Sequence, residues 1–193
     1  MEESQSIYPS ILASLLLLCQ GYIPAVILGI PLGILVGIDR VIYRILKRIF
    51  QIPATIPSIA LLPIALIGLK NNQQAVLFVI FFSAIWQIII NTATGVQKFR
   101  SNGKDLRDAI HHTFTGMRMA MGLAWFTLIA GEFLTGGKGI GFFIWDAYNS
   151  NMIDEIVKAL FYIAIIGLLL DGVLELAGYL ISRQVPEDRE SEM

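Results

Sequence analysis

The stretch 114-FTGMRMAMGLAWFTLIAGEFLTGGKGIGFFIWDAY-148 decides the fold of this chain. Its first part, Thr115 to Leu134, is an apolar run about long enough to cross a bilayer as one helix. The glycines between positions 136 and 141 then end the helix and allow the backbone to turn sharply. The aromatic residues that follow suit a membrane–water boundary. The stretch therefore predicts a spanning helix and, after it, an external glycine-rich and aromatic loop over 135–155.

The composition places the rest of the chain in a membrane as well. Of its 193 residues, 55% are hydrophobic and 15% are charged, whereas a soluble domain carries roughly 25% charged residues. The charges are clustered and leave long apolar runs between them, so we expect an all-α polytopic membrane protein. The net charge of −1 gives no indication of a nucleic-acid partner.

About five spanning segments are predicted within a membrane domain at 11–182. An external segment at 1–10 precedes this domain, and an acidic cytoplasmic tail at 183–193 follows it. The five segments are apolar and lie near 11–38, 53–69, 75–94, 115–134 and from 156 onwards. Pro57 and Pro63 predict an irregular start to the second segment, surrounded by protein rather than lipid.

Small residues recur at every fourth position of the first span. They share one helix face, and a stripe of this kind lets another helix approach closely in lipid. Packing within the chain and contact with another subunit both fit the pattern. The stripe consists of Gly21, Ala25, Gly29, Gly33 and Gly37.

The segment 39–51 predicts a basic amphipathic helix lying on a membrane surface. Isoleucine, leucine and valine side chains form one face, and the opposite face carries Arg40, Arg44, Lys47 and Arg48. Anchoring is the favoured role of this helix, and lipid-dependent regulation is the alternative.

Basic residues indicate the orientation of the chain. The loops at 39–51 and 97–112 each contain four lysines or arginines, whereas the segments at 70–74 and 135–155 contain one each. Cytoplasmic loops of membrane proteins are enriched in these residues. We therefore expect the two basic loops and the C-terminus in the cytoplasm and the N-terminus outside.

Four polar or charged residues within the predicted spans are candidates for a translocation path or gate. Gln87 and Asn91 fit either helix–helix hydrogen bonding or path lining. Arg118 and Glu132 lie fourteen positions apart, which separates them by roughly 21 Å on one helix, so they do not pair. Arg118 either extends to the membrane surface or attracts an anion. Glu132 makes a structural hydrogen bond, pairs with Lys138 or acts in gating.

The sequence offers little for catalysis. Asp108 and His112 lie four apart, a spacing that could hold a metal or form an acid–base pair on a helix. A third ligand at suitable spacing is missing, so a solvated loop is the favoured interpretation. We expect no catalytic site, no metal and no cofactor.

The motifs FTGMRMAMGLAW, AGEFL and GGKGIGFFIWDAY resemble the permease subunits of ATP-binding-cassette importers of the nitrate, bicarbonate, cyanate and sulfonate group. The resemblance extends from Leu12 to Leu180, and GIGFFIWDAY is most similar to the nitrate and bicarbonate branch. It implies a multi-pass protein of the inner membrane that works with a second permease copy, a cytoplasmic ATPase and an external binding protein. Nitrate or bicarbonate is the first expected substrate, and a sulfonate is the second. The family motif also carries a glutamate at the position of Glu132.

One part of the family pattern is incomplete. The resemblance implies a cytoplasmic coupling helix between the third and fourth of these spans, with a Glu-Ala-Ala start, a glycine and a Leu-Pro pair. The candidates for a remnant of its start are Lys104, Asp105, Leu106, Arg107, Asp108 and Ala109. The later glycine, the Leu-Pro pair and roughly half of the loop are absent from 97–112. Weakened or lost ATP coupling is therefore expected, and the alternative function is a repurposed, permease-like interaction subunit.

Overall fold

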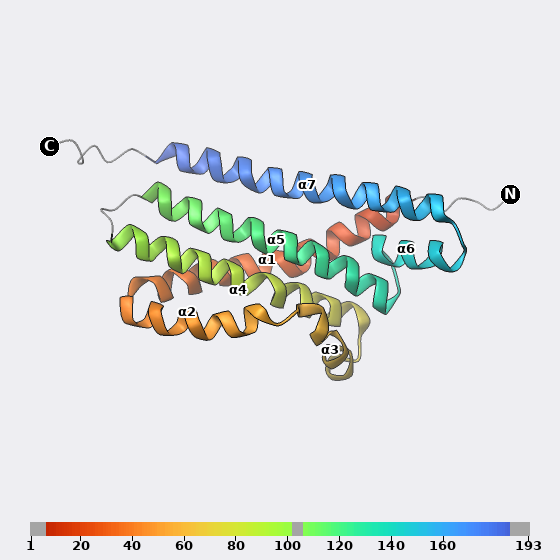
Figure 1. Ribbon diagram of the computed structural model, residues 1–193, viewed down its shortest axis with the longest axis horizontal. Coiled ribbons are helices and arrows are strands. Elements are labelled where there is room, and N and C mark those ends of the chain that lie inside the picture. The colour runs from red at the N-terminus through yellow and green to blue at the C-terminus, as the bar shows by residue number, and fades with distance from the viewer. Residues whose placement is uncertain (1–6, 102–105, 186–193) are drawn as a thin grey trace.

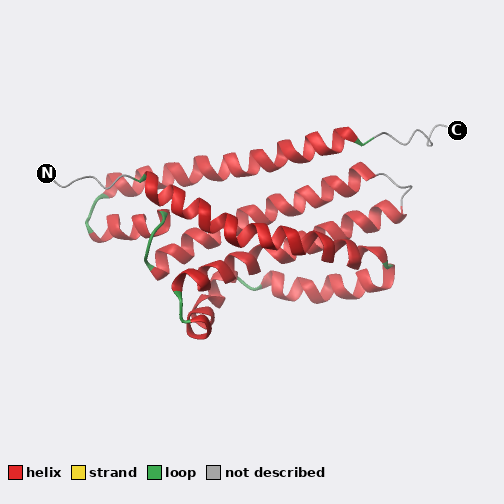
Figure 2. Ribbon diagram, turned by 180° about the vertical axis from the view of Figure 1, so that it is seen from behind, coloured by secondary structure: helices red, strands yellow, loops and turns green. Residues whose placement is uncertain are grey.

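The computed structural model describes residues 7–101 and 106–185 as helices joined by short loops (Figures 1 and 2). Within these residues, four helices are long and apolar enough to cross a membrane. They run side by side along the molecule (Figure 1). These helices are α1 (Tyr8–Ile38), α4 (Asn72–Ser101), α5 (Leu106–Thr135) and α7 (Ile153–Gln184).

A fifth span is possible because two shorter segments combine. Helix α2 (Arg40–Thr55) is followed by the 3-10 helix η1 (Ser58–Leu61) and by α3 (Leu62–Leu69). Together they are long and apolar enough to form one span, which is bent by 73° at the break. Five spans would match the predicted number.

The start of this second span differs from the prediction. The basic helix, predicted over 39–51, continues past Pro53 to Thr55. The chain leaves the helix at Ile56, where ψ is 122°, because the residue before a proline, here Pro57, is sterically excluded from the helical conformation. A proline in the last turn of a helix, such as Pro53, costs only one backbone hydrogen bond.

The basic helix lies beside the long helices of the bundle. Helix α2 runs alongside α4 rather than across the ends of the long helices (Figure 1). Tyr43 Oη lies 3.0 Å from Thr94 Oγ1 on α4, and the rings of Phe50 and Trp86 are 5.6 Å apart. Helix α2 therefore packs against α4, and the expectation that it lies on a membrane surface stays a prediction.

Asp39 explains where α2 begins. Its carboxylate accepts hydrogen bonds from the backbone N–H groups of Val41 and Ile42, at 2.7 and 2.9 Å. The bonds from Ile42 and Val41 hold the pKa of Asp39 below its usual range. Side chains that satisfy the free N–H groups of a first turn are typical helix N-caps.

The small-residue stripe of α1 lies against α4 of the same chain. A side chain added at Gly21 would place its Cβ 2.6 Å from Ile80 Cγ2, and one at Gly33 would lie 2.6 Å from Thr92 Cβ. Ala25 is fully buried in the same interface. Of the two alternatives for this stripe, the structure shows packing within the chain.

Helix α4 forms the centre of the bundle. It packs against both α1 and α5, and side chains such as Ile80 and Ile88 are completely buried. Helix α7 lies on the outside, where only Ala159 and Gly178 are buried. Because apolar side chains are stable in lipid as well as in a core, an exposed apolar α7 is expected of a membrane protein.

Two predicted loops are largely helical. In the segment 97–112, α4 continues to Ser101 and α5 begins at Leu106. The two helices approach closely because Gly95 lacks a side chain: a Cβ there would lie 2.8 Å from the backbone oxygen of Ala109. A separate coupling helix is therefore not found in the described part of this connection.

The predicted external loop at 135–155 likewise contains a helix, α6 (Ile140–Asn149). The expected glycine turn precedes it. Gly136, Gly137 and Gly139 have φ angles of 74°, 111° and 140°. Residues that carry a side chain rarely adopt these positive φ angles. These glycines let the chain reverse after α5 so that α6 packs back against the bundle.

We expect Gly33→Leu to destabilise the α1–α4 interface by at least about 1–3 kcal/mol, because the added side chain would overlap Thr92. Gly172→Leu is the matched control, since nothing lies within 4 Å of a Cβ added at that helical glycine. Ile34→Leu, on the exposed side of α1, should also be mild. The measurement is the melting temperature of the purified chain in detergent, and equal values for the two glycine variants would contradict the role of this contact.

Candidate functional site at the break in the second span

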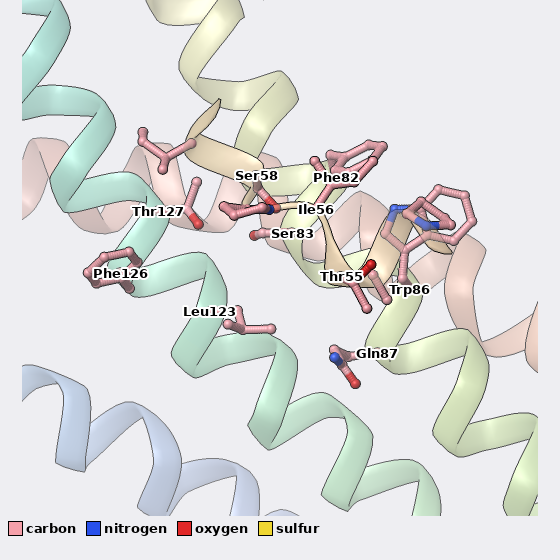
Figure 3. Close-up of a pocket in the computed structure, with 14 residues that line it drawn as sticks. Thr55, Ile56, Ser58, Phe82, Ser83, Trp86, Gln87, Leu123, Phe126 and Thr127 are labelled. Atoms are coloured by element: carbon pink, nitrogen blue, oxygen red, sulfur yellow. The ribbon is translucent and has the colours of Figure 1, made fainter. Parts of the chain in front are cut away.

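A cavity of about 280 Å³ lies where the break between α2 and η1 meets α4 and α5 (Figure 3). Its wall combines aromatic rings with uncharged polar groups, and no charged side chain is among its described lining residues. The polar lining residues are Thr55, Ser58, Ser83, Trp86, Gln87 and Thr127.

Helix periodicity brings these side chains together. Trp86 and Gln87 follow Ser83 by three and four positions on α4, so both project from the same side of the helix as Ser83. Thr127 projects from α5 toward Ser58 and Ser83 (Figure 3). The chain break adds the residues between Pro53 and Ile59 to the wall.

The polar groups of the cavity fall into two sets. Thr55 Oγ1 donates to the backbone oxygen of Ile52, and Ser83 Oγ donates to that of Ile80, both at 2.7 Å. By contrast, Trp86 Nε1 is buried without a hydrogen-bond partner in the described structure. Such a group is rare, because an unsatisfied buried donor costs about 1–3 kcal/mol.

Gln87 lines the cavity, but Asn91 does not. The Asn91 side-chain amide donates to the backbone oxygen of Gln87 at 2.9 Å. Gly116 of α5 closes over Asn91, since a Cβ at Gly116 would lie 2.5 Å from Asn91 Cβ. Of the two predicted polar residues of α4, one lies at the candidate site and the other at the α4–α5 contact.

Arg118 is held by two carboxylates of α7. Its Nε and Nη2 atoms donate to the two oxygens of Asp171 at 2.7 and 2.5 Å, and Nη2 lies 3.0 Å from Glu175 Oε2. Arg118 therefore forms an ion pair between α5 and α7, and its expected role at the membrane surface or toward an anion stays a prediction. The sequence contained a signal, because Asp171 and Glu175 lie four apart on one face of α7. Asp171 is 53 positions from Arg118, however, and this distance hid the pairing.

Glu132 lies in a hydrogen-bond network at the opposite end of α5. Its side chain is 2% exposed, and its oxygens accept bonds from Ser14 Oγ at 2.8 Å and from the backbone N–H of Gly141 at 3.0 Å. The N–H of Ile140 donates in turn to Ser14 Oγ at 2.9 Å. The network joins α1, α5 and α6, as the structural alternative predicted, and no ion pair with Lys138 is found among the described residues.

The candidate coupling residues that the structure describes lie at the beginning of α5 and do not line the cavity. Lys104 and Asp105 lie outside the described residues. Leu106, Arg107, Asp108 and Ala109 form the first turn of α5. The Nε atom of Arg107 donates to the backbone oxygen of Val185 at 3.0 Å, which connects this turn to the end of α7.

The histidines nearby form no metal site in the described structure. His112 Nε2 lies 2.9 Å from Lys98 Nζ. No group of three or more histidine, cysteine, aspartate or glutamate side chains suited to a metal is present among the described residues.

Comparison with known proteins relates this architecture to transport subunits. Nitrate import permease protein NrtB of Leptolyngbya laminosa is 41% identical over 203 residues, which cover 96% of this chain and 72% of the relative. The NrtB protein of a Synechocystis species is 43% identical over 93% of this chain and 70% of the relative. Bicarbonate transport system permease protein CmpB of the same species is 42% identical, covering 83% and 64%.

A family match covers most of the membrane domain. It includes residues 29–102 and 106–185 and therefore skips only the connection between α4 and α5 within that span of sequence. The matched residues contain α2, η1, α3, the residues that line the cavity, and all of α4, α5 and α7. The chain belongs to the family described as binding-protein-dependent transport system inner membrane component.

Proposed function

We propose that the chain is the membrane-spanning permease subunit of an ATP-driven importer for a small anion, with nitrate or bicarbonate as first candidate. The observation that carries this proposal is the 41–43% identity to nitrate and bicarbonate permeases over 83–96% of the chain. The cavity at the break after α2 agrees with it, because its described lining residues include polar groups but no carboxylate that would repel an anion.

A sulfonate is the second candidate. Putative aliphatic sulfonates transport permease protein SsuC of Escherichia coli is 28% identical over 63% of this chain. The lower identity and coverage favour the smaller anions.

We further infer the orientation from the distribution of charge. The beginning of α2, the connected ends of α4 and α5 and the end of α7 lie at one end of the bundle (Figure 1). Both basic segments of the sequence are brought to this end, which the positive-inside rule assigns to the cytoplasm. An external binding protein would then deliver the anion at the end formed by α6, and an ATPase would act at the basic end.

Thiol labelling of intact cells tests the orientation. In a Cys19→Ser background, Lys138→Cys should react with an impermeant thiol reagent before lysis, whereas Lys47→Cys should react only after lysis. The opposite labelling pattern would reverse the orientation and remove the ATPase from the connection between α4 and α5.

A second copy of the chain is proposed to pack against α5 beside the cavity. Three apolar side chains at helical spacing are exposed there: Met119, Leu123 and Phe126 are 51%, 42% and 66% exposed. Leu123 and Phe126 also line the cavity. Polar groups are costly to place beside lipid hydrocarbon. We therefore expect protein rather than lipid to contact the face of α5 beside the cavity.

Cysteine cross-linking tests this interface. In the Cys19→Ser background, Phe126→Cys should form a disulfide-linked dimer in native membranes under mild oxidation. Val173→Cys on α7 is the control, because Val173 is equally exposed at 66% but lies away from the cavity. Dimers formed only by the α7 variant would place the second copy on the other helix.

Energy coupling is proposed to act through the short connection between α4 and α5. Ser101 and Leu106 end and begin long packed helices, so a movement imposed there would pass along both of them. The contact with an ATPase would be smaller than an inserted coupling helix provides. We therefore expect a functional complex that dissociates more readily during purification.

Reconstitution into vesicles tests the proposed function directly. The chain, combined with the ATPase and the binding protein encoded beside it, should import ¹⁵N-nitrate or ¹³C-bicarbonate and should stimulate ATP hydrolysis when the anion is present. Vesicles that lack only this chain are the control. A stable complex that neither imports the anions nor stimulates hydrolysis would support the repurposed interaction subunit instead.

A further inference from the structure

Helix α2 has a continuous polar face that ends at the cavity. Arg40, Arg44 and Arg48 follow one another at four-residue intervals, and residues at this spacing lie above one another on a helix. Gln51 and Thr55 continue this arginine face, because they lie seven and eleven positions after Arg44, close to two and three full turns. Thr55 also lines the cavity. The arginine face therefore leads from the basic end of the bundle to the cavity.

The three arginines of this face have no partner in the part of the chain that the structure describes. They are exposed, and none of them forms a hydrogen bond or an ion pair with a described residue. By contrast, Lys47 donates to Tyr43 Oη at 2.9 Å, and Tyr43 Oη lies 3.0 Å from Thr94 Oγ1 of α4. Helix α2 thus turns a different side to α4, and its arginines are free to meet a negative charge from outside the chain.

The contacts with α4 show how far along the bundle this face extends. Tyr43 meets Thr94 near the beginning of α2, and Phe50 packs against Trp86 near its end. Trp86 lies at the middle of α4, so α2 follows α4 from the basic end of the bundle to its middle (Figure 1). Arg48, two positions before Phe50, is therefore deep in the bundle. An arginine at membrane depth is costly beside lipid and is expected to face a partner or a water-filled path.

We propose that the arginine face of α2 is the inner half of the anion path, along which a monovalent anion moves in steps from the cavity to the cytoplasm. This inference rests on the proposed function, because it names residues on the route of the same anion. Successive arginines are about 6 Å apart along the helix axis, so an anion that leaves one guanidinium group is within reach of the next. Conduction requires sites that attract an ion and also release it, and a row of single, exposed cations meets both conditions.

The arginine face supplies a charge that the cavity lacks. The described lining residues of the cavity include no lysine or arginine, so a positive potential that attracts the anion must come from beside it. Arg48 lies seven positions before Thr55, about 10 Å along the helix axis. The row of arginines therefore begins close to the cavity and continues toward the basic end.

Anionic lipid headgroups would also pair with arginines, but they fit only part of this face. Headgroups remain at the membrane surface, whereas Gln51 and Thr55 extend the polar face as far as the cavity. Acyl chains offer these two side chains no hydrogen-bond partner. A small anion in water is therefore the occupant that suits the whole face.

Cysteine accessibility tests the path independently of transport. In a Cys19→Ser background, Arg48→Cys in inside-out membrane vesicles should react with the small anionic reagent sulfonatoethyl methanethiosulfonate. The cationic trimethylammonium-ethyl reagent should react at least about tenfold more slowly, because Arg40 and Arg44 concentrate anions beside the cysteine. A thiol reagent attached to a long polyethylene glycol chain should not react, since the path admits only small ions.

Two positions serve as controls for labelling. Ile49→Cys follows Arg48 directly but projects from the apolar side of α2, where Ile49 is 49% exposed, and it should react with none of these reagents. Arg183→Cys lies at the exposed end of α7 and should react with the polymer reagent as well.

Import by the reconstituted complex tests the charges themselves. The double substitution Arg44→Gln/Arg48→Gln should lower nitrate import at least about tenfold, because it removes most of the local positive potential. Arg48→Lys keeps the charge and should retain most of the import. Arg183→Gln removes a charge from the same end of the bundle but not from the face, and import should stay within about twofold because exposed, distant charges are screened.

Three results would overturn the inference. One is reaction of Arg48→Cys with the polymer reagent, which would place α2 on an open membrane surface. Another is equal import by the Arg44→Gln/Arg48→Gln and Arg183→Gln variants. The third is a loss of import that occurs only in vesicles containing phosphatidylglycerol, which would assign the arginines to anionic lipid. If the unmodified complex imports neither anion, the importer proposal fails, and the labelling decides by itself whether the arginines face a path that small anions enter.

Discussion

The close approach of α1 and α5 to α4 is the constraint on which the rest of the structure depends. In lipid there is little hydrophobic gain from bringing helices together, so their association relies on close packing. Gly21 and Gly33 allow α1 to touch α4, while Gly95 and Gly116 allow α5 to do so on the other side. Helix α4 is thereby fixed at the centre, and the orientation of its polar residues is fixed with it.

The break between α2 and η1 is subject to a different requirement of the membrane. Backbone N–H and C=O groups must be satisfied wherever lipid surrounds them. The extended residue Ile56 and the adjacent Pro57 interrupt the helical bonds, and this is tolerated because they face a cavity enclosed by α4 and α5. The same interruption creates space beside Trp86 and Gln87. A local defect of the helix and a candidate anion site are thus one feature.

The charged residues within the spans act mainly as connections between helices. Arg118 joins α5 to α7 through Asp171 and Glu175, and Glu132 joins α5 to α1 and α6 through Ser14 and Gly141. Each group is compensated, as expected where desolvation of a lone charge is costly. The neutral cavity lies between these two connections along α5, so neither an unpaired cation nor an unpaired carboxylate dominates it.

The amino-acid sequence by itself determined the all-helical membrane class, the segments that could span and the packing stripe of α1, because hydrophobicity and helical spacing are local properties. It also identified Gln87 as a candidate for lining the translocation path and Glu132 as a candidate for a structural hydrogen bond or a gate. Only the tertiary structure decided that α2 packs against α4, that Arg118 pairs with Asp171, and that Trp86 and Thr127 share a cavity. These facts depend on contacts between residues far apart in the chain, and helical periodicity contains no information about which faces of two distant helices meet.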